Sequence, residues 1–379
     1  MSRTLILGGG FGGLAAAHAL RSMLAATDEV VLVERQPTFV MGLRKSWALV
    51  GSGDLAGGER RLDLLTGRGI EVVTGEITAI EPEAKAAVVD GRRLAGDALI
   101  VALGAARAPE SVPGFGENVH NVYERSSLAR AAEALRSTKG GAIAIGIFGV
   151  PYTCPPAPYE MAFLVNDFLR SRGVPARVEI FTPQPMSLPV VGQAGCDVLE
   201  ARLSEEGIDF YPNHQALAVE PGEVVFSGGR GRFDLLLGVP PHRCPAVAAS
   251  AGLTDGGPWV KVNPSTMETR FPGVYAIGDV VEIPLANKMM LPKAGVFAES
   301  QAQVAAFHIA AALTGGTANA VFNGEGYCYL EVGRGLAMEV RGDFLAAPAP
   351  AVSIGAPLAS HLNEKRDFEA TRLRKWFGA

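Results

Sequence analysis

Short apolar runs alternate with helix-forming segments along much of the 379-residue chain. Residues 4–7 form the first run, and a helix-forming segment, 14–24, and a second apolar run, 30–33, follow it. Strand and helix signals in this alternating order predict an α/β fold built on parallel sheets. The later apolar runs that we predict to be strands are 97–103, 141–147, 177–181, 233–237 and 273–277.

Glycines fill the turn between the first strand and the first helix. Gly8, Gly10 and Gly13 satisfy the pattern G-x-G-x-x-G, and Glu34 ends the second strand about 20 residues later. In such a loop the first glycine permits the tight turn, the second lets the backbone approach a pyrophosphate, and the third lets helix pack on strand. The helix N-terminus offers N–H groups to phosphates, and the acid can accept hydrogen bonds from ribose hydroxyls. This order of parts predicts a dinucleotide-binding fold.

Two later segments indicate which dinucleotide is bound. Residues 97–104 are an apolar run that ends in glycine, and residues 273–279 are another that ends in Gly-Asp. They resemble the inner motifs of the two-dinucleotide-fold flavoproteins, the glutathione-reductase-like class, in which the aspartate hydrogen-bonds the ribityl chain of FAD. The resemblance implies an α/β protein with two Rossmann-like folds and FAD as cofactor. The expected FAD-binding residues are Gly8, Gly10, Phe11, Gly13, Glu34, Arg35, Gly104, Gly278, Asp279, Gly295 and Val296.

The middle of the chain carries only part of a second dinucleotide site. Flavoproteins of this class that use NAD(P)H carry a second G-x-G-x-x-G there. In this chain the strand at 141–147 runs instead into a loop with four prolines, which cannot form the first turns of a pyrophosphate-binding helix. We predict that the helix starts near Tyr159 and reaches about Arg172. The next strand ends in Thr182-Pro183, without an acid for an adenosine ribose, so NAD(P)H is expected to be a poor substrate.

Four segments together resemble one family of such flavoproteins. Residues 154–160, Cys-Pro-Pro-Ala-Pro-Tyr-Glu, are similar to the cysteine loop of sulfide:quinone oxidoreductases and of the flavin subunit of flavocytochrome c sulfide dehydrogenase; residues 239–243, 291–299 and 326–329 agree. The resemblance implies a redox disulfide between Cys154 and Cys328 beside the flavin. It implies oxidation of sulfide or a related sulfur compound, with electrons passed to a quinone or a cytochrome. It also implies that Cys154 carries the persulfide and that Cys328 lies beside the flavin.

The resemblance also brings charged residues into the expected site. Glu160 could accept a proton, or could be an acid at a helix start that the helix dipole favours. Lys293 could add positive charge near the flavin or the acceptor, or could be a surface lysine. Gly295 and Val296 would open a helix whose N-terminus faces the flavin and stabilises its anionic reduced form.

Two features depart from the family pattern. Residues 1–153 contain no cysteine, which predicts that FAD is bound non-covalently. The final segment, 361–377, predicts one helix with Leu373, Trp376 and Phe377 among its apolar residues. It could lie on a membrane as an interfacial anchor, or could pack on the body or on a second copy in a homodimer. Its cations are Lys365, Arg366, Arg372, Arg374 and Lys375.

Composition narrows the possible partners. The net charge of −5 and the pI of about 5.8 argue against nucleic acid. The four cysteines lie far apart in sequence, so no metal site is expected. Cys196, Cys244 and His242 are interpreted as structural residues. No signal peptide or membrane span is recognisable, which favours a cytoplasmic protein that at most contacts a membrane peripherally.

The motifs divide the chain into three parts. We expect a discontinuous FAD-binding domain (1–108 and 258–320), a degenerate second fold with Cys154 (109–257) and a C-terminal region with Cys328 (321–379). Two other functions stay open. An NAD(P)H-dependent flavin reductase, of the type II NADH dehydrogenase or ferredoxin-reductase kind, would show rapid flavin bleaching by NADH. A non-enzymatic redox sensor would show flavin reduction without turnover.

Overall fold

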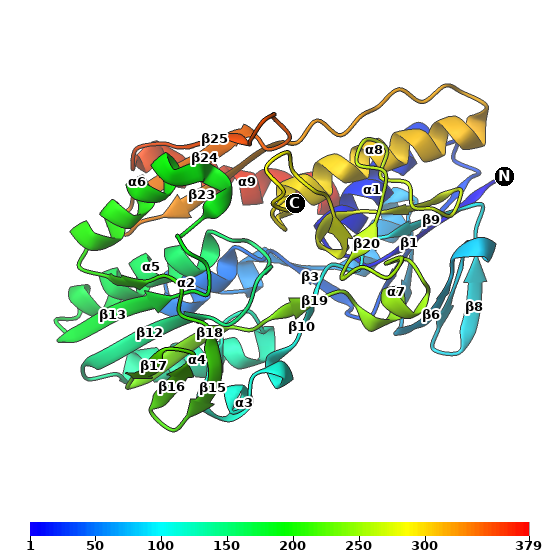
Figure 1. Ribbon diagram of the computed structural model, residues 1–379. Coiled ribbons are helices and arrows are strands. Elements are labelled where there is room, and N and C mark those ends of the chain that lie inside the picture. The colour runs from blue at the N-terminus through cyan, green and yellow to red at the C-terminus, as the bar shows by residue number, and fades with distance from the viewer. Residues whose placement is uncertain (379) are drawn as a thin grey trace.

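A five-stranded parallel sheet forms one half of the structure, a computed structural model that describes residues 1–378. Its central strands are buried on both faces, which explains their runs of Val, Ile, Leu and Ala. Two helices pack against each other over this sheet (Figure 1). The strand order is β21 (Val274–Ala276), β9 (Ala98–Val101), β1 (Arg3–Leu7), β2 (Glu29–Glu34) and β5 (Glu71–Thr74); the helices are α1 (Phe11–Met23) and α8 (Gly295–Thr314).

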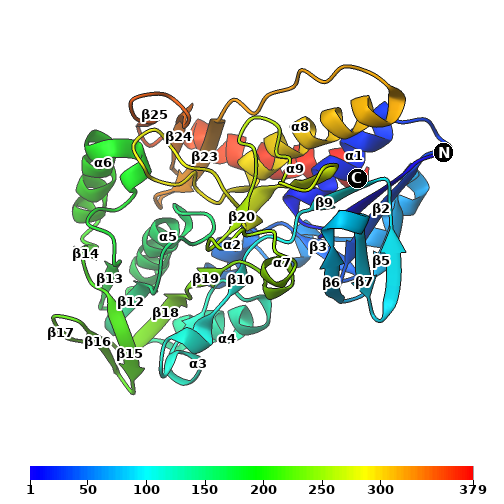
Figure 2. The ribbon, with the colours of Figure 1, turned by 45° about the vertical axis from the view of Figure 1, so that its right-hand side comes forward.

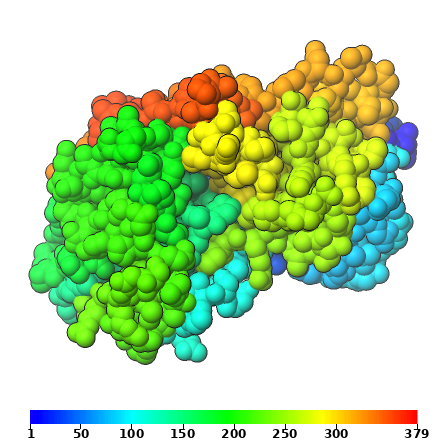
Figure 3. All heavy atoms as spheres, in the orientation of Figure 1, coloured from blue at the N-terminus to red at the C-terminus, as the bar shows by residue number. Residues whose placement is uncertain are grey.

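A second five-stranded parallel sheet forms the other half, beside the first (Figure 1). One face of the molecule is hollowed where the two halves meet (Figure 3). The strand order is β11 (His120–Asn121), β18 (Leu235–Val239), β12 (Gly141–Ile147), β13 (Ala176–Phe181) and β14 (Asp209–Tyr211). The accompanying helices are α4 (Arg125–Ser137), α5 (Ala157–Ser171) and α6 (Gly192–Glu205).

Smaller elements extend both halves. Two antiparallel three-stranded sheets are β6 (Ile77–Glu81), β7 (Ala86–Val89) and β8 (Arg92–Ala95), and β15 (Ala216–Glu220), β16 (Glu223–Phe226) and β17 (Gly229–Arg232). The paired short strands are β3 (Thr38–Val40) with β4 (Glu59–Arg61), β10 (Ala106–Arg107) with β19 (His242–Arg243), and β20 (Val260–Lys261) with β22 (Val281–Glu282). The short helices are α2 (Arg44–Val50), α3 (Phe115–Asn118) and α7 (Ala246–Ser250).

The C-terminal part consists of an antiparallel sheet and the final helix. The sheet contains β23 (Glu325–Glu331), β24 (Ala337–Asp343) and β25 (Ala351–Ile354), and α9 (Ala359–Phe377) runs from it to α1 (Figure 2). The ring of Trp376 is fully buried and packs edge-on against Phe11 and Phe39, at centroid distances of 5.2 and 5.6 Å. Of the alternatives for this helix, packing on the body is therefore the observed one. Within residues 1–378 no helix is long and apolar enough to cross a membrane.

The structure confirms the α/β fold with two Rossmann-like sheets and shifts several predicted boundaries. α1 begins at Phe11, earlier than predicted, because Gly12 and Gly13 belong to its first turn. α5 begins at Ala157, before Tyr159, because a proline in the first helical turn lacks an N–H that would have no partner there anyway. The chain around Cys328 forms a hairpin of β23 and β24. The division into domains at 108, 257 and 320 stays a prediction.

Candidate active site

One cavity, of about 330 Å³, is lined by segments from distant parts of the chain. The loop after β1, the loop between β12 and α5, the start of α8, and β23 with α9 all contribute to its wall. We call it the central cavity. Its wall includes Gly10, Phe11, Gly12, Lys45, Gly104, Tyr123, Thr153, Cys154, Glu160, Gly278, Asp279, Lys293, Gly295, Val296, Tyr327, Cys328, Lys365 and Phe368.

The loop after β1 has two positions that only glycine fits. Gly8 has a φ of +107°, and a Cβ there would lie 2.3 Å from the carbonyl oxygen of Ala102. A Cβ on Gly13 would lie 1.8 Å from the carbonyl oxygen of Gly8. At Gly10, by contrast, a Cβ would meet nothing within 4 Å, so this backbone is open. An open glycine backbone at the N-terminus of α1 is a suitable cradle for the pyrophosphate of FAD.

The acidic residue at the end of β2 lies close to this loop. Glu34 accepts hydrogen bonds from the N–H of Gly9 (2.7 Å) and from the N–H of Gln36 (3.0 Å). Its neighbour Arg35 is exposed and lies 3.9 Å from Glu76. Gly8, Gly13, Glu34 and Arg35 are outside the wall of the central cavity; the first three hold the glycine loop, whereas Arg35 lies on the surface.

The Gly278-Asp279 turn and the start of α8 lie together at the central cavity. Burial raises the pKa of Asp279 above its usual value. Lys293 donates to the carbonyl oxygens of Asp279 (2.6 Å) and Val281 (3.1 Å), and its Nζ lies 3.4 Å from the centre of the Trp259 ring. Burial lowers the pKa of Lys293 to about 8. Lys293 is thus a buried residue at the cavity and not a surface lysine.

The structure brings Cys154 and Cys328 to the same cavity as free thiols. Cys154 has a φ of +51°, and its N–H donates to the carbonyl oxygen of Lys293 at 2.7 Å. The hydroxyl of Tyr123 donates to the carbonyl oxygens of Thr153 (3.0 Å) and Cys154 (3.3 Å). These bonds fix the cysteine loop against the start of α8.

The surroundings of the two thiols favour their protonated forms. The Cys154 side chain is exposed toward the cavity, and protein crowds it on its other sides. Burial, and after it the Glu160 carboxylate, raises the pKa of Cys154 to about 11. Burial, and after it Cys154, raises the pKa of Cys328 even further above its usual value. A group that accepts protons beside these thiols would therefore assist their ionisation.

Glu160 is buried beside an unexpected partner from the C-terminal helix. Its Oε2 accepts a hydrogen bond from Lys365 Nζ at 2.6 Å and one from the N–H of Glu331 at 3.0 Å. The same lysine donates to Glu331 Oε1 at 2.8 Å. Lys365, one of the cations of the final helix, is therefore buried inside the protein, where it bonds to two buried carboxylates. The periodicity of the final helix gave no signal for this, since the partners lie far away in sequence.

Two further residues of the cavity wall, Lys45 and Tyr123, were not predicted from the sequence. Lys45 donates to the carbonyl oxygen of Tyr123 at 3.0 Å, and its Nζ lies 5.8 Å from the centre of the Tyr123 ring. Burial lowers the pKa of Lys45 to about 8. The only available signal was the segment 39–47, which resembles the flavin-flanking region of the quinone-reducing family members.

The residues interpreted as structural lie outside the wall of the central cavity. Cys196 and Cys244 are buried in hydrophobic clusters. His242 Nε2 lies 3.3 Å from Thr153 Oγ1, and its Nδ1 lies 2.8 Å from the carbonyl oxygen of Pro240. Burial lowers the pKa of His242 to about 4, so the ring is neutral near pH 7. Its contact with Thr153 supports the cysteine loop.

Comparisons with known proteins identify the family of the chain. The family model described as pyridine nucleotide-disulphide oxidoreductase matches residues 2–305. The mitochondrial sulfide:quinone oxidoreductase of Dictyostelium discoideum is 27% identical over 76% of this chain and 67% of its own length. The sulfide-quinone reductase of Aquifex aeolicus is 27% identical over 80% of this chain and 75% of its own length. An NADH dehydrogenase-like protein of Mycobacterium tuberculosis is 27% identical over 60% of both chains.

The fold has a similar counterpart among solved structures. The crystal structure of the sulfide:quinone oxidoreductase from Aquifex aeolicus superposes with a TM-score of 0.89. The superposition covers 100% of this chain and 92% of that one, at 22% identity. This similarity demonstrates a shared fold.

Proposed function

The chain belongs to the pyridine nucleotide-disulphide oxidoreductase family, and from that premise we propose that it is an FAD-dependent enzyme that oxidises sulfide and reduces a quinone. One observation carries the proposal: two free cysteines from distant segments line the same cavity as the glycine loop and the Gly278-Asp279 turn. The similarity to proteins named sulfide:quinone oxidoreductase supports both sulfide as donor and quinone as acceptor. A cytochrome acceptor stays a prediction from the family resemblance.

We propose that FAD is bound non-covalently, because no cysteine precedes Cys154. The glycine loop and Glu34 would hold its pyrophosphate and adenosine ribose, and Asp279 its ribityl chain. The N-terminus of α8 at Gly295 and Val296 would offer positive dipole to the flavin. When bound, the flavin supplies a two-electron acceptor beside the cysteines.

The two cysteines would act as a disulfide in the oxidised enzyme. Hydrosulfide attacks one sulfur, so that the Cys154–Cys328 bond breaks, a new sulfur–sulfur bond forms, and the other cysteine leaves as a thiolate. We assign the persulfide to Cys154, because its side chain is the more exposed to the cavity, and the leaving thiolate to Cys328. Glu160 would accept the proton of the persulfide, since burial disfavours both thiolates in this cavity.

A flat apolar acceptor would find aromatic side chains in the same cavity. Tyr327 and Phe368 line it, with ring centroids 6.1 Å apart. Aromatic surfaces of this kind suit a quinone ring. We propose a cytoplasmic protein that would reach a membrane quinone through peripheral contact with the bilayer. Trp376 and Phe377 of α9 are buried in the protein, so other residues would have to make that contact.

The second candidate function is an NAD(P)H-dependent flavin reductase, because some relatives are named NADH dehydrogenase-like proteins. The second sheet argues against it. A Cβ on Gly146 in β12 would lie 2.4 Å from the Phe181 ring and 2.6 Å from the Phe148 ring, so aromatic groups fill the space at this strand end. β13 is followed by Thr182, and not by an acid that could bind a ribose.

Anaerobic titration of the flavin-containing protein with sulfide tests the proposal. Sulfide should bleach the flavin of the wild type, whereas Cys154→Ser and Cys328→Ser should lose this response by several orders of magnitude. Cys196→Ser, a buried cysteine away from the cavity, is the matched control and should behave as the wild type. If sulfide bleaches the flavin of both cavity variants as fast as it bleaches that of the wild type, the cysteine mechanism is wrong.

A further inference from the structure

A row of buried ionisable side chains leads away from the central cavity. Lys365 Nζ donates to Glu160 Oε2 at 2.6 Å and to Glu331 Oε1 at 2.8 Å. The exposed fractions of the three side chains are only 5%, 6% and 9% in that order. The indole N–H of Trp47 donates to the same Glu331 oxygen at 2.5 Å and fixes the far end of the row.

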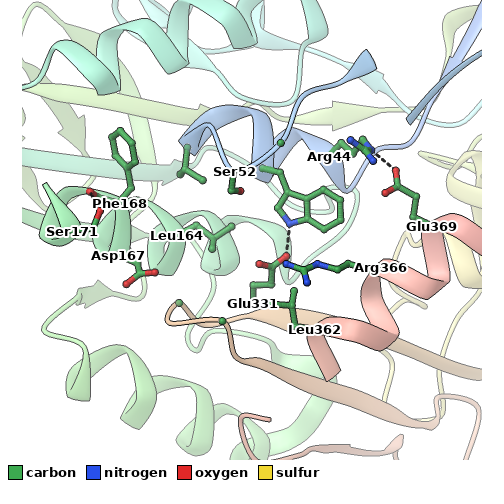
Figure 4. Close-up of a pocket in the computed structure, with 15 residues that line it drawn as sticks. Arg44, Ser52, Leu164, Asp167, Phe168, Ser171, Glu331, Leu362, Arg366 and Glu369 are labelled. Carbon is green, nitrogen blue, oxygen red and sulfur yellow. Dashed lines mark hydrogen bonds and ion pairs between the residues drawn. The ribbon is translucent and has the colours of Figure 1, made fainter. Parts of the chain in front are cut away.

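The two ends of this row lie at different cavities. Glu160 and Lys365 line the central cavity, whereas Glu331 lines a second one of about 520 Å³, which we call the outer cavity. Figure 4 shows Glu331 at the outer cavity, together with Arg366 and Glu369 of α9. Arg366 is exposed, so the outer cavity is open to solvent. No residue of the described chain lines both cavities.

In this row one ammonium group joins two carboxylates. Two carboxylates and one ammonium group leave one net negative charge in a buried place, which desolvation penalises. Because Lys365 bonds to both carboxylates, it can pass a proton to Glu331 and regain one from Glu160. A proton that enters at one end then leaves at the other without a change in the position of any side chain.

We propose that Glu160, Lys365 and Glu331 form a proton-transfer path from the central cavity to the solvent in the outer cavity. The path rests on the proposed oxidation of sulfide. When hydrosulfide is oxidised to the zero-valent level, its S–H bond breaks and one proton leaves the sulfur at the cysteines. The bound flavin would accept the two electrons together with one proton taken separately from solvent, so the proton released at the cysteines needs its own route out of the cavity. That proton passes to Glu160, and Glu331 delivers one to water.

Glu331→Gln tests the path, because glutamine can still accept a hydrogen bond from Lys365 but cannot take up its proton. Stopped-flow reduction of the flavin by sulfide should slow about tenfold, less than the roughly 100-fold or more expected for a directly acting acid–base group. The slower step should also show a larger solvent deuterium isotope effect than the wild type. Asp167→Asn is the matched control: Asp167 lines the same outer cavity but bonds to the Arg334 N–H and not to Lys365.

A second variant provides a test by rescue. Glu331→Ala should be slow as well, and formate, which can enter the outer cavity, should restore its rate while leaving the rate of Asp167→Ala unchanged. A Glu331→Gln protein with the wild-type rate and isotope effect, or a Glu331→Ala protein that formate does not accelerate, would overturn the path. Either result leaves sulfide oxidation standing if the wild type is still reduced, whereas a wild type that sulfide cannot reduce removes the proposed function as well.

Discussion

The loops after β1 and β12 occupy equivalent places, at the carboxyl ends of parallel strands, yet they are built in opposite ways. After β1 the helix begins almost at once, and an open glycine backbone lies at its N-terminus. After β12 the chain passes through Cys154, which has a φ of +51°, before α5 begins at Ala157. The first loop offers backbone N–H groups to a phosphate, whereas the second presents a thiol to the central cavity.

The two loops also differ in what supports them. Close backbone contacts set the first, as the positions at Gly8 and Gly13 illustrate. Residues from distant elements support the second: the Tyr123 hydroxyl donates to the loop carbonyl of Thr153, and Lys365 of α9 bonds to Glu160 in the helix that follows the loop. A dinucleotide fold can therefore exchange a nicotinamide site for a sulfur site by changing one loop, provided that other parts of the chain supply the new contacts.

The largest expected effect is on stability and comes from the side-chain support of the second loop. Lys365→Met leaves Glu160 and Glu331 buried without their cation, which should cost about 3–5 kcal/mol in the free energy of unfolding. Urea denaturation measures it. Lys375→Met on the same helix removes an exposed lysine paired with Glu299 and should cost less than about 1 kcal/mol. If both variants lose the same free energy of unfolding, the buried Glu160–Lys365–Glu331 row does not stabilise the fold.

The next effect separates the chemistry of the two loops. Glu160→Gln should slow flavin reduction by sulfide about 100-fold, because it removes the carboxylate that we propose as the proton acceptor beside the cysteines. Glu34→Gln, at the first loop, should weaken FAD binding but leave the reduction rate of bound flavin unchanged. Rapid-mixing kinetics at saturating sulfide and FAD measure both. A slow Glu34→Gln with a normal Glu160→Gln would reverse the roles assigned to the loops.

A smaller effect concerns cofactor retention. Gly13→Ala forces a Cβ against the Gly8 carbonyl oxygen, a steric cost of about 1–3 kcal/mol that should weaken FAD binding about tenfold or more. Gly149→Ala introduces a contact of 2.9 Å with the Pro241 side chain near the second loop and should retain the flavin. The flavin-to-protein absorbance ratio after dialysis distinguishes the two variants. Flavin loss from Gly149→Ala alone would place the cofactor at the second sheet and contradict the assignment to the first.

The smallest effect is on the ionisation of Cys154. Its pKa is raised from 9.0 to about 11, so the folded protein holds this thiol proton more tightly than the unfolded chain. Stability from this group is therefore lost as pH rises from about 9 toward 11. Glu160→Gln removes the carboxylate charge, which after burial is the main cause of the raised pKa, and should therefore lower the pKa of Cys154. The rate of Cys154 alkylation at pH 9 should rise as a result, by less than the roughly tenfold that one pKa unit represents. An unchanged pH profile would show that Glu160 does not influence Cys154.

The sequence predicted well what depends on local pattern. The glycine loop and the parallel strands follow from spacing and hydrophobic periodicity, and the Gly278-Asp279 turn follows from the resemblance to flavoproteins; the structure contains all three. It predicted poorly what depends on long-range pairing. Lys365 resembles any exposed lysine on an amphipathic helix until tertiary contacts place it between Glu160 and Glu331. The two alternatives for α9 also required the structure, because an apolar stripe suits a membrane and a protein surface equally well.

The central claim is that the second loop exchanges a nicotinamide site for a sulfur site, and single-turnover reduction of the bound flavin by two donors tests it most directly. With equal concentrations of sulfide or NADH under anaerobic conditions, we predict rapid bleaching by sulfide, none by NADH on the same timescale, and loss of the sulfide response in Cys154→Ser. Faster bleaching by NADH than by sulfide, unchanged in Cys154→Ser, would contradict the claim.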